Sequence, residues 1–426
     1  MAEIGSEAVA SACNDLKRNA ETADRPADAA MRIALVTGNF GYIRDGASQA
    51  LNLLVDHLSR AGHIVRVYTP AAAECAVAAG ATLVSIPSIK IPRRSEYRLA
   101  LGLPRAQRRD LVSFRPDVLH LAAPDLLGFA ALRLAERCGW PVIASLHTRF
   151  ETYLEFYKLG WLRPLVEQRL HAFYRRADLV LAPTRSLCDD FASQGLGAKV
   201  RLWSRGVDRS RFDPQRRDPE WRRARGFRDD DIVLLFFGRL VREKGTQTFV
   251  DTVRLLRARG FAARVLIVGD GPERHSLAGH LPDAEFTGFL TGDELGRALA
   301  SSDIFVNPSR SEAFGNVNLE AMAAGLAIVT ADEGSSRELI EHERTGLLCA
   351  PGGAEGYADA VSRLVRDVPL QRRLGSAARR ASEAYQWEHI FGSVIAAYRE
   401  AVQRRTACVG TPQKIPDVST LHRALG

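Results

Sequence analysis

The chain has 426 residues, of which 46% are hydrophobic and 25% charged, and its formal net charge is +8. This length exceeds what a single hydrophobic core normally supports, so we expect at least two domains. No apolar run reaches the length of a bilayer-spanning helix, and residues 1–30 lack the apolar core of a secretory signal. Only six of the 58 basic residues are lysine. This arginine bias makes the net charge uninformative about partners and each lysine more informative.

The cysteines exclude two further classes of protein. They are scattered and form no CxxC pair, which argues against a zinc site and against a disulfide framework. Isolated cysteines fit a reducing environment, so we expect a cytoplasmic protein. The six positions are Cys13, Cys75, Cys138, Cys188, Cys349 and Cys408.

Two series of strands and helices follow one another along the chain. Short apolar runs bounded by glycine-containing loops predict buried parallel strands, and amphipathic stretches between them predict helices. The first series has predicted strands at 31–37, 64–68, 118–121, 142–145 and 179–182, with a helix at 48–61. The second has predicted strands at 232–237, 265–269, 284–287, 303–306 and 327–330, with a helix at 246–259.

This alternation predicts an α/β protein with two Rossmann-like, doubly wound domains facing a central cleft. We expect the last helix to return to the first domain and both ends of the chain to be flexible. The expected boundaries are 1–30 for an extension, 31–205 for the N-terminal domain, 206–385 for the C-terminal domain, 386–406 for the returning helix and 407–426 for a tail.

A loop after the strand at 232–237 is suited to binding a diphosphate. The strand ends at Gly238, and Arg239 and Lys244 flank the turn before the next helix. Cations beside the free N–H groups of a helix N-terminus favour anions. An ordinary solvated loop would explain Arg239 about as well, but Lys244 less well, because lysine is rare in this chain.

A second constellation lies at 309–325. Glu312 is in a loop, and Glu320 falls in the first turns of a helix that we expect to begin near Asn316. Two carboxylates around free amide groups suit a sugar nucleotide. One carboxylate can accept hydrogen bonds from sugar hydroxyls, and the other can accept them from the ribose diol. Favourable pairing with the helix dipole alone would explain Glu320. It would not explain Glu312, or Gly315 beside Phe314, which we expect to be exposed.

On these residues the chain resembles the large retaining family of GT-B glycosyltransferases, the family 4 type, whose signature is two glutamates eight positions apart. Other similar segments are 238–244, 268–272, 286–289 and 331–346. Within the family the segments 200–208 and 312–317 look closest to GDP-mannose-dependent α-mannosyltransferases and to sulfoquinovosyl- and other glycosyl-diacylglycerol synthases. The resemblance covers roughly 31–400. It implies a hexosyltransferase that takes its sugar from a nucleotide diphosphate donor, with acceptors bound by the N-terminal domain and donors by the C-terminal domain.

The resemblance also implies residue roles. The catalytic group would comprise His147, which would project toward the donor sugar, together with Arg239, Lys244 and Glu312. The donor-binding group would comprise Gly46, Gly288, Phe289, Phe314, Gly315, Asn316 and Glu320. The loop around Gly46 departs from the family's double glycine, which puts its contacts in doubt. We expect no cofactor and no metal. The DxD spelling at Asp229–Asp231 precedes a strand rather than following one, so we interpret it as a solvated loop.

The acceptor is suggested by residues 88–109. Seven cations and one acid alternate there with apolar side chains, which suits an anionic membrane surface and a lipid or membrane-presented glycan acceptor. We therefore expect peripheral association with the inner face of a membrane, in a role such as glycolipid biosynthesis. The alternative is an arginine-rich surface loop and helix. Nucleic acid is a poorer partner because stacking aromatics are nearly absent.

Several readings remain open. Mannose from GDP-mannose is the favoured donor, and a UDP-sugar-dependent diacylglycerol glucosyl-, glucuronosyl- or sulfoquinovosyltransferase is the alternative. A sugar-nucleotide epimerase shares the architecture but needs no acceptor. A non-catalytic sugar-nucleotide-binding module is a third possibility, and the intact set of charged residues argues against it. A nicotinamide oxidoreductase is disfavoured because neither of the glycine-containing loops at 38–41 and 269–271 has a complete GxGxxG motif.

Overall fold

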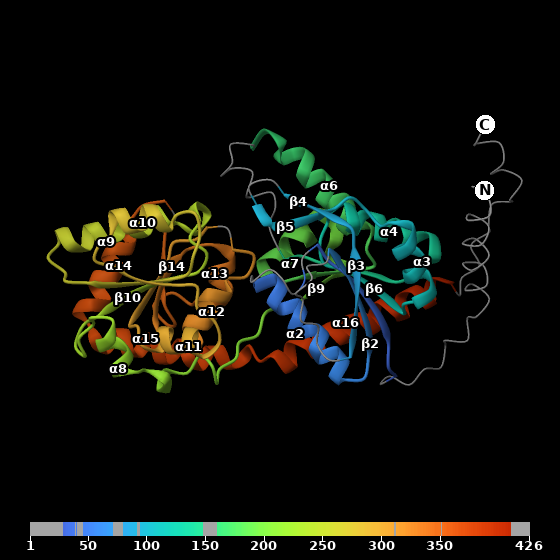
Figure 1. Cartoon of the computed structure of the whole chain (residues 1–426). Helices are drawn as coiled ribbons and strands as arrows, with labels where there is room; N and C mark the ends of the chain where they lie inside the picture. Colours follow the sequence, from blue (N-terminus) through green and yellow to red (C-terminus); the bar gives the residue numbers. More distant parts are fainter. Residues whose placement is uncertain are drawn as a thin grey trace, which may run out of the picture.

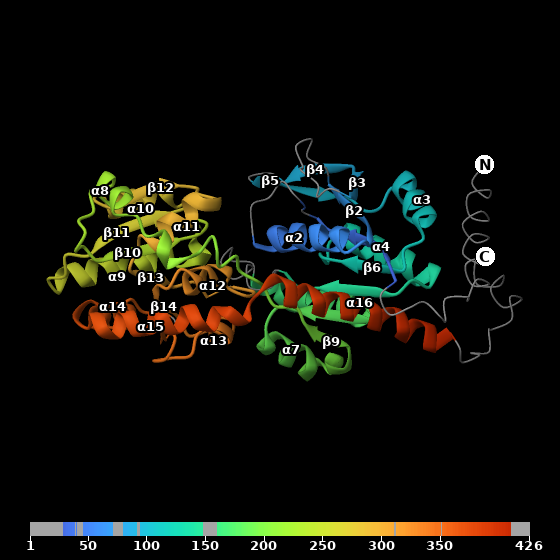
Figure 2. The same ribbon diagram turned by 90° about the horizontal axis from the view of Figure 1, so that it is seen from below.

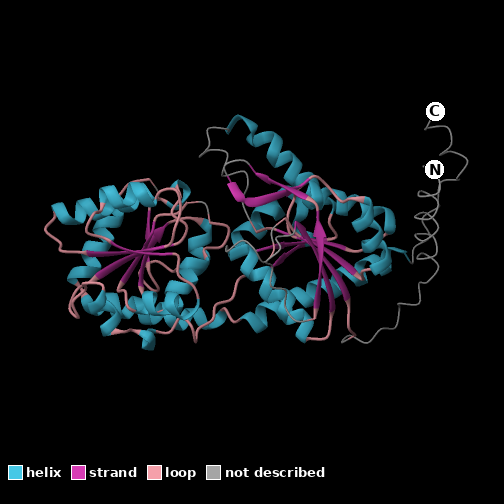
Figure 3. Ribbon diagram, viewed as in Figure 1, coloured by secondary structure: helices cyan, strands magenta, loops and turns pink. Residues whose placement is uncertain are grey.

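The computed structural model describes residues 29–38, 40, 46–70, 80–91, 94–147, 160–310, 312–350 and 352–409. The chain forms two lobes, each a parallel sheet with helices on both faces (Figures 1 and 3). The predicted class, α/β with two Rossmann-like domains, is confirmed. Each lobe encloses its own apolar core, as expected for a chain of this length.

The N-terminal sheet has seven parallel strands in the order β3-β2-β1-β6-β7-β8-β9. The order reverses at β1, which pairs with β2 on one side and β6 on the other, and ligands of such sheets bind beyond the strand ends near this reversal. The strands are β1 (Arg32–Val36), β2 (Ile64–Pro70), β3 (Ala81–Ile86), β6 (Val118–Leu121), β7 (Val142–Ser145), β8 (Leu179–Ala182) and β9 (Val200–Leu202). The helices are α2 (Gly46–Arg60), α3 (Arg105–Phe114), α4 (Leu126–Cys138), α6 (Arg163–Arg176) and α7 (Arg185–Phe191).

The C-terminal sheet has six parallel strands in the order β12-β11-β10-β13-β14-β15. Its central strand has the sequence VLLFF and is buried throughout, because helices cover both faces. The strands are β10 (Val233–Phe237), β11 (Arg264–Val268), β12 (Glu285–Gly288), β13 (Ile304–Asn307), β14 (Ala327–Ala331) and β15 (Leu347–Cys349). The helices are α8 (Pro219–Ala224), α9 (Thr246–Ala258), α10 (Arg274–His280), α11 (Gly292–Ala300), α12 (Asn316–Ala323), α13 (Gly334–Leu339), α14 (Glu355–Arg366) and α15 (Val368–Ala381).

The last helix, α16 (Trp387–Val409), runs from the C-terminal lobe along the N-terminal lobe (Figures 1 and 2). Its apolar side chains, including Phe391, Val394 and Tyr398, join a core cluster with Ile33 and Trp203 of the N-terminal lobe. The burial of these side chains fixes α16 against the N-terminal sheet, so the chain crosses between the lobes twice.

The predicted strands all occur, with ends within two residues of expectation. The sequence did not single out β3, β9 and β15, which are edge strands or only three residues long. Residues 88–109 also differ from the expected loop and helix. They begin with an antiparallel hairpin of β4 (Ser88–Ile91) and β5 (Arg94–Ala100), and α3 starts at the end of the segment.

Candidate active site

The loop after β13 and the start of α12 form the centre of the candidate site. Gly315 begins the helix in a left-handed conformation, with φ of 92°, which glycine adopts without strain. Behind it, Asn318 accepts a hydrogen bond from Asn307 at 2.8 Å and contacts Thr330 and Ser336 at 3.4 Å. This buried polar network holds the helix start against the carboxyl ends of β13 and β14.

Lys244 and Glu312, predicted from separate motifs, form an ion pair. Lys244 Nζ lies 2.5 Å from Glu312 Oε1, and both side chains are mostly buried. The contact depends on a close approach of two loops. Gly245 has φ of +73°, and a Cβ there would lie 2.8 Å from the carbonyl oxygen of Pro308. Glycine at 245 therefore lets the lysine loop reach the glutamate loop.

The charges in this pair are maintained despite burial. Burial alone would raise the pKa of Glu312, but the ammonium of Lys244 and the guanidinium of Arg239 hold that pKa below its usual value. Glu312 is therefore an anion at neutral pH. A bound anionic ligand would approach the two cations Lys244 and Arg239, and Lys244 is already held by the carboxylate of Glu312.

A pocket of about 440 Å³ lies between the two lobes. Three of the predicted donor-binding residues, Gly46, Asn316 and Glu320, line it. Gly46 comes from the first turn of α2 and Asn316 from the first turn of α12, so two helix N-termini meet there. The remaining lining residues are Gln49, Leu53, Gly206, Val207, Asp208, Arg209, Arg211, Phe212, Gln386, Trp387 and Glu388.

Glu320 has an unusual proton affinity for a carboxylic acid. Burial raises its pKa to about 8, and Arg211 only partly opposes the rise. A half-buried carboxyl group with a raised pKa, lining a cleft, is typical of a ligand-binding position. It can act as hydrogen-bond donor or acceptor near neutral pH.

His147 follows β7 and is not among the residues that line this pocket. Its Nδ1 accepts a hydrogen bond from Arg205 at 2.9 Å, and its Nε2 lies 2.8 Å from Ser145 Oγ. Both ring nitrogens therefore bind protein groups. The ring also packs edge-on against Trp203, with centroids 5.0 Å apart. His147 lies at the carboxyl edge of the N-terminal sheet, two residues after the end of β7.

The other predicted residues lie around the same end of the C-terminal sheet. Gly288 ends β12 with φ of +72°, and Phe289 beside it is 47% exposed. Arg239 follows β10 after a single residue, Gly238. The expectation that Phe314 is exposed is wrong. Its ring is buried and packs 6.2 Å from the ring of Tyr385, so only its backbone could serve a ligand.

The DxD sequence lies outside this site. Asp229 pairs with Arg223 at 2.9 Å, and Asp231 lies 3.7 Å from Arg264, both before β10 and thus at the opposite edge of the sheet. Within the described ranges, no three His, Cys, Asp or Glu residues come together as a metal site would require. Likewise, no helix in the described part of the chain is long and apolar enough to cross a membrane.

Sequence reasoning missed several residues of the cleft. Arg211 and Trp387 line the pocket but belong to the linker and to the start of α16, which carry no motif. Arg205, which contacts His147, and Tyr398, which contacts His120, both lie far from these histidines in sequence. The family resemblance of segment 200–208 is the only sequence signal that points toward Arg205.

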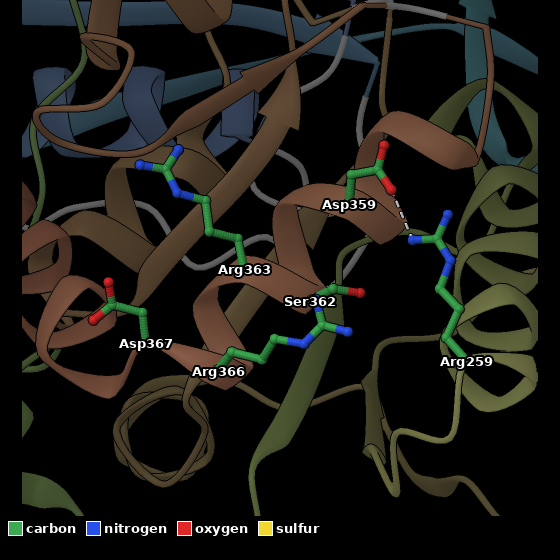
Figure 4. Close-up of a pocket in the computed structure, with 6 residues that line it drawn as sticks. All are labelled: Arg259, Asp359, Ser362, Arg363, Arg366 and Asp367. Carbon is green, nitrogen blue, oxygen red and sulfur yellow. Dashed lines mark hydrogen bonds and ion pairs between the residues drawn. The ribbon is translucent and has the colours of Figure 1, made fainter.

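A second hollow, of about 500 Å³, lies between α9 and α14 and contains none of the predicted residues (Figure 4). Its charged side chains largely neutralise one another: Arg259 pairs with Asp359 at 2.8 Å, and Arg363 pairs with Glu343. The lining residues are Arg259, Asp359, Ser362, Arg363, Arg366 and Asp367. We therefore take the cleft between the lobes as the candidate site.

Solved structures share the fold over most of this chain. An Anabaena protein, HepE, crystallised in complex with UDP, superposes with a TM-score of 0.68 at 18% identity, covering 87% of this chain and 100% of that one. Two Rossmann-like lobes with a cleft between them are the GT-B fold.

The sequence comparisons give the family. Residues 44–211 match the model described as Glycosyltransferase Family 4, and residues 231–367 match Glycosyl transferases group 1. A GDP-mannose-dependent alpha-mannosyltransferase of Mycolicibacterium smegmatis is 35% identical over 88% of this chain and 99% of its own length. The sulfoquinovosyl transferase SQD2 of Arabidopsis thaliana is 33% identical over 72% of this chain and 61% of its own length. The chain belongs to glycosyltransferase family 4.

Proposed function

We propose that this protein is a retaining, metal-independent α-mannosyltransferase that transfers mannose from GDP-mannose to a lipid or to a membrane-presented glycan. The observation that carries the proposal is the Lys244–Glu312 pair beside the start of α12, with Glu320 in the adjoining interlobe pocket. The mannosyltransferase relative, which matches over nearly its whole length, supports the choice of donor.

The diphosphate of the donor would bind at the start of α12. The first N–H groups of a helix have no partner within the helix, and Lys244 and Arg239 supply the positive charge. Glu312 holds Lys244 in place before the donor binds, and then accepts hydrogen bonds from hydroxyl groups of the transferred sugar. Glu320 accepts hydrogen bonds from the ribose diol at the pocket side of the same helix.

The reaction breaks the bond between the sugar C1 and the diphosphate oxygen and forms a bond from C1 to an acceptor oxygen. The negative charge that develops on the departing diphosphate is stabilised by Lys244, Arg239 and the helix amides, which are already oriented for it. Attack from the face that the diphosphate leaves would retain the configuration. The departing phosphate then takes the acceptor proton, so no protein base is required.

The proposed lipid or membrane-presented acceptor is based on exposed side chains of the N-terminal lobe. In the hairpin and the loop after it, Lys90, Ile89 and Leu101 are exposed, and in α3 the side chains of Arg105, Arg108 and Arg109 are exposed. Leu103, by contrast, is buried in the core and cannot contribute. Cations beside exposed apolar side chains suit the headgroup region of an anionic membrane.

Another exposed apolar pair lies at the start of α6. Trp161 is 76% exposed and Leu165 is 52% exposed, and exposed Arg169 follows on the same helix. In the view of Figure 1, α6 and the hairpin β4–β5 both lie on the upper side of the N-terminal lobe. Tryptophan is favoured at membrane interfaces because its ring is apolar and its N–H is polar. This surface supports a membrane-presented acceptor.

The full-length protein should be incubated with GDP-mannose, UDP-glucose, UDP-glucuronate and UDP-sulfoquinovose, each with a bacterial lipid extract, and the products analysed by mass spectrometry. We expect a lipid-linked hexose from GDP-mannose. Product from UDP-sulfoquinovose alone would replace the donor assignment, in line with the SQD2 relative. Conversion of a donor without acceptor would instead indicate an epimerase. NMR of the product should show an α-linkage, and a β-linkage would overturn retention.

A further inference from the structure

A continuous chain of four hydrogen bonds runs from Arg205, which precedes the pocket-lining Gly206, to the last helix. Arg205 Nη2 lies 2.9 Å from His147 Nδ1, and His147 Nε2 lies 2.8 Å from Ser145 Oγ. Ser145 Oγ lies 2.8 Å from His120 Nε2, and His120 Nδ1 lies 2.7 Å from the hydroxyl of Tyr398. The five residues come from β6, β7, the loops after β7 and β9, and α16.

The proton positions along this chain follow from one residue. A guanidinium group can only donate, so His147 Nδ1 must accept from Arg205. A neutral imidazole then carries its hydrogen on Nε2, which donates to Ser145 Oγ. The Ser145 hydroxyl is left to donate to His120 Nε2, and His120 donates from Nδ1 to Tyr398. If the Ser145 hydroxyl donated to His147 Nε2 instead, both ring nitrogens of His147 would be acceptors and the ring would carry no N–H proton.

The surroundings favour neutral rings. Ser145, His120 and Tyr398 are fully buried, and Trp203 contacts both histidine rings. Burial lowers the pKa of His120 to about 3. Burial, followed by the nearby charge of Arg205, lowers the pKa of His147 well below its usual value. Protonation of His147 at Nδ1 would also place a second hydrogen against the Arg205 guanidinium.

We propose that Arg205, His120 and Tyr398 are positioning residues that hold His147 as the neutral Nε2–H tautomer at the carboxyl edge of the N-terminal sheet. The inference rests on the proposed function together with the family resemblance, which implies that His147 projects toward the donor sugar. In this state His147 presents a fixed dipole and does not exchange protons with the substrate. Because Tyr398 belongs to α16, the docking of the returning helix supports the orientation of the His147 ring through His120 and Ser145.

The test uses the full-length protein labelled with 15N-histidine, without any donor, so its outcome does not depend on which sugar is transferred. The His147 signals are assigned by comparison with His147→Gln. We expect His147 Nε2 to be protonated, Nδ1 to be unprotonated, and this pattern to persist from pH 8 to pH 5.5. A proton on Nδ1, or titration of His147 within that range in the wild type, would overturn the proposal.

Two variants connect this pattern to activity. Tyr398→Phe removes the final acceptor, and we expect exchange-broadened or mixed-tautomer His147 signals and a five- to twentyfold lower kcat, with the donor KM within about twofold. Arg205→Met removes the donor to His147 Nδ1, so we expect mixed-tautomer His147 signals and a His147 pKa above that of the wild type, and Arg205→Lys should partly restore the wild-type signal. The matched control is Tyr357→Phe, which changes an equally buried tyrosine of the C-terminal lobe. If Arg205→Met fails to fold, Tyr398→Phe decides, and an unchanged His147 spectrum with unchanged kcat in that variant would refute the proposal.

Discussion

Gly46, at the start of α2, lies directly against Asn316, at the start of α12. A Cβ at position 46 would lie 2.1 Å from Asn316 Nδ2 and 3.1 Å from its Cγ. The two residues belong to different lobes, so this contact sets how closely two helix N-termini approach across the cleft. It also gives Gly46 a steric role that does not require the double glycine common in the family.

Replacement of Gly46 should therefore act through Asn316. Gly46→Ala should displace the Asn316 side chain and lower kcat/KM by roughly three- to tenfold, because the N-termini can no longer approach. Asn316→Ala removes the clash, so we expect Gly46→Ala to have little further effect in that background. Steady-state kinetics of the four proteins test this coupling. Equal effects of Gly46→Ala in both backgrounds would contradict the steric explanation.

Lys244→Ala should remove a charge that stabilises the departing diphosphate. We expect turnover to fall by roughly 10²–10³-fold, the usual loss for such a group. Arg242→Ala is the matched control, because Arg242 lies in the same turn but is 85% exposed. Since Lys244→Ala also leaves buried Glu312 without its partner, thermal unfolding should be measured alongside, with Lys244→Ala/Glu312→Gln as a second variant. Near wild-type turnover in folded Lys244→Ala would remove Lys244 from the mechanism.

Glu320 should make the stability of the protein depend on pH. Its pKa of about 8 in the folded chain exceeds the ordinary value of 4.5, so the folded state keeps a proton that the unfolded state loses. Its contribution to stability is fully present below pH 4.5 and is lost as the pH rises through 8. Glu320→Gln stays neutral, so its free energy of unfolding relative to wild type should increase from pH 5 to pH 8.5.

We expect this increase to be roughly 1–2 kcal/mol once solvent screening is considered, measured by chemical denaturation at both pH values. The exposed Glu220 provides the control substitution, Glu220→Gln. A stability difference between Glu320→Gln and wild type that is the same at pH 5 and pH 8.5 would mean that Glu320 has no raised pKa.

Catalysis should not require a metal ion. In the proposed mechanism, Lys244 and Arg239 supply the positive charge for the diphosphate, and Asp229 and Asp231 lie near arginines at the other edge of the sheet. We expect turnover to persist after dialysis against EDTA. Activity that disappears with EDTA and returns only with Mg²⁺ or Mn²⁺ would reinstate the two aspartates as candidate ligands.

Membrane binding should depend on the arginines of α3. Wild type should float with vesicles containing phosphatidylglycerol and bind less as salt increases. The variant Arg105→Ser/Arg108→Ser/Arg109→Ser should bind at least about tenfold more weakly. A control variant with the same charge change, Arg372→Ser/Arg373→Ser/Arg380→Ser, alters exposed arginines of the C-terminal lobe and should bind like wild type. Equal binding by all three proteins, or none by wild type, would favour a soluble acceptor.

The fold class and the central strands could be predicted from the amino-acid pattern alone. Apolar runs such as 232–237 must be buried on both faces, and this requirement is local and strong. The sequence also identified Lys244, Glu312 and Glu320 as candidate site residues. Each stands in a motif after a strand or at a helix start, and a parallel sheet brings such loops together at one edge. The edge strand β9 and the hairpin β4–β5 were not predicted, since short or half-exposed strands carry little periodic signal.

The contacts between distant side chains became visible only in the folded chain. The ion pair of Lys244 with Glu312 spans 68 positions, and the contact of His120 with Tyr398 spans 278. Such contacts depend on how α16 docks and how closely the two lobes approach, which no local pattern encodes. The burial of Phe314 was mispredicted for the same reason, because its neighbour Tyr385 lies far along the chain. Packing between distant elements, rather than local preference, sets the chemistry of this cleft.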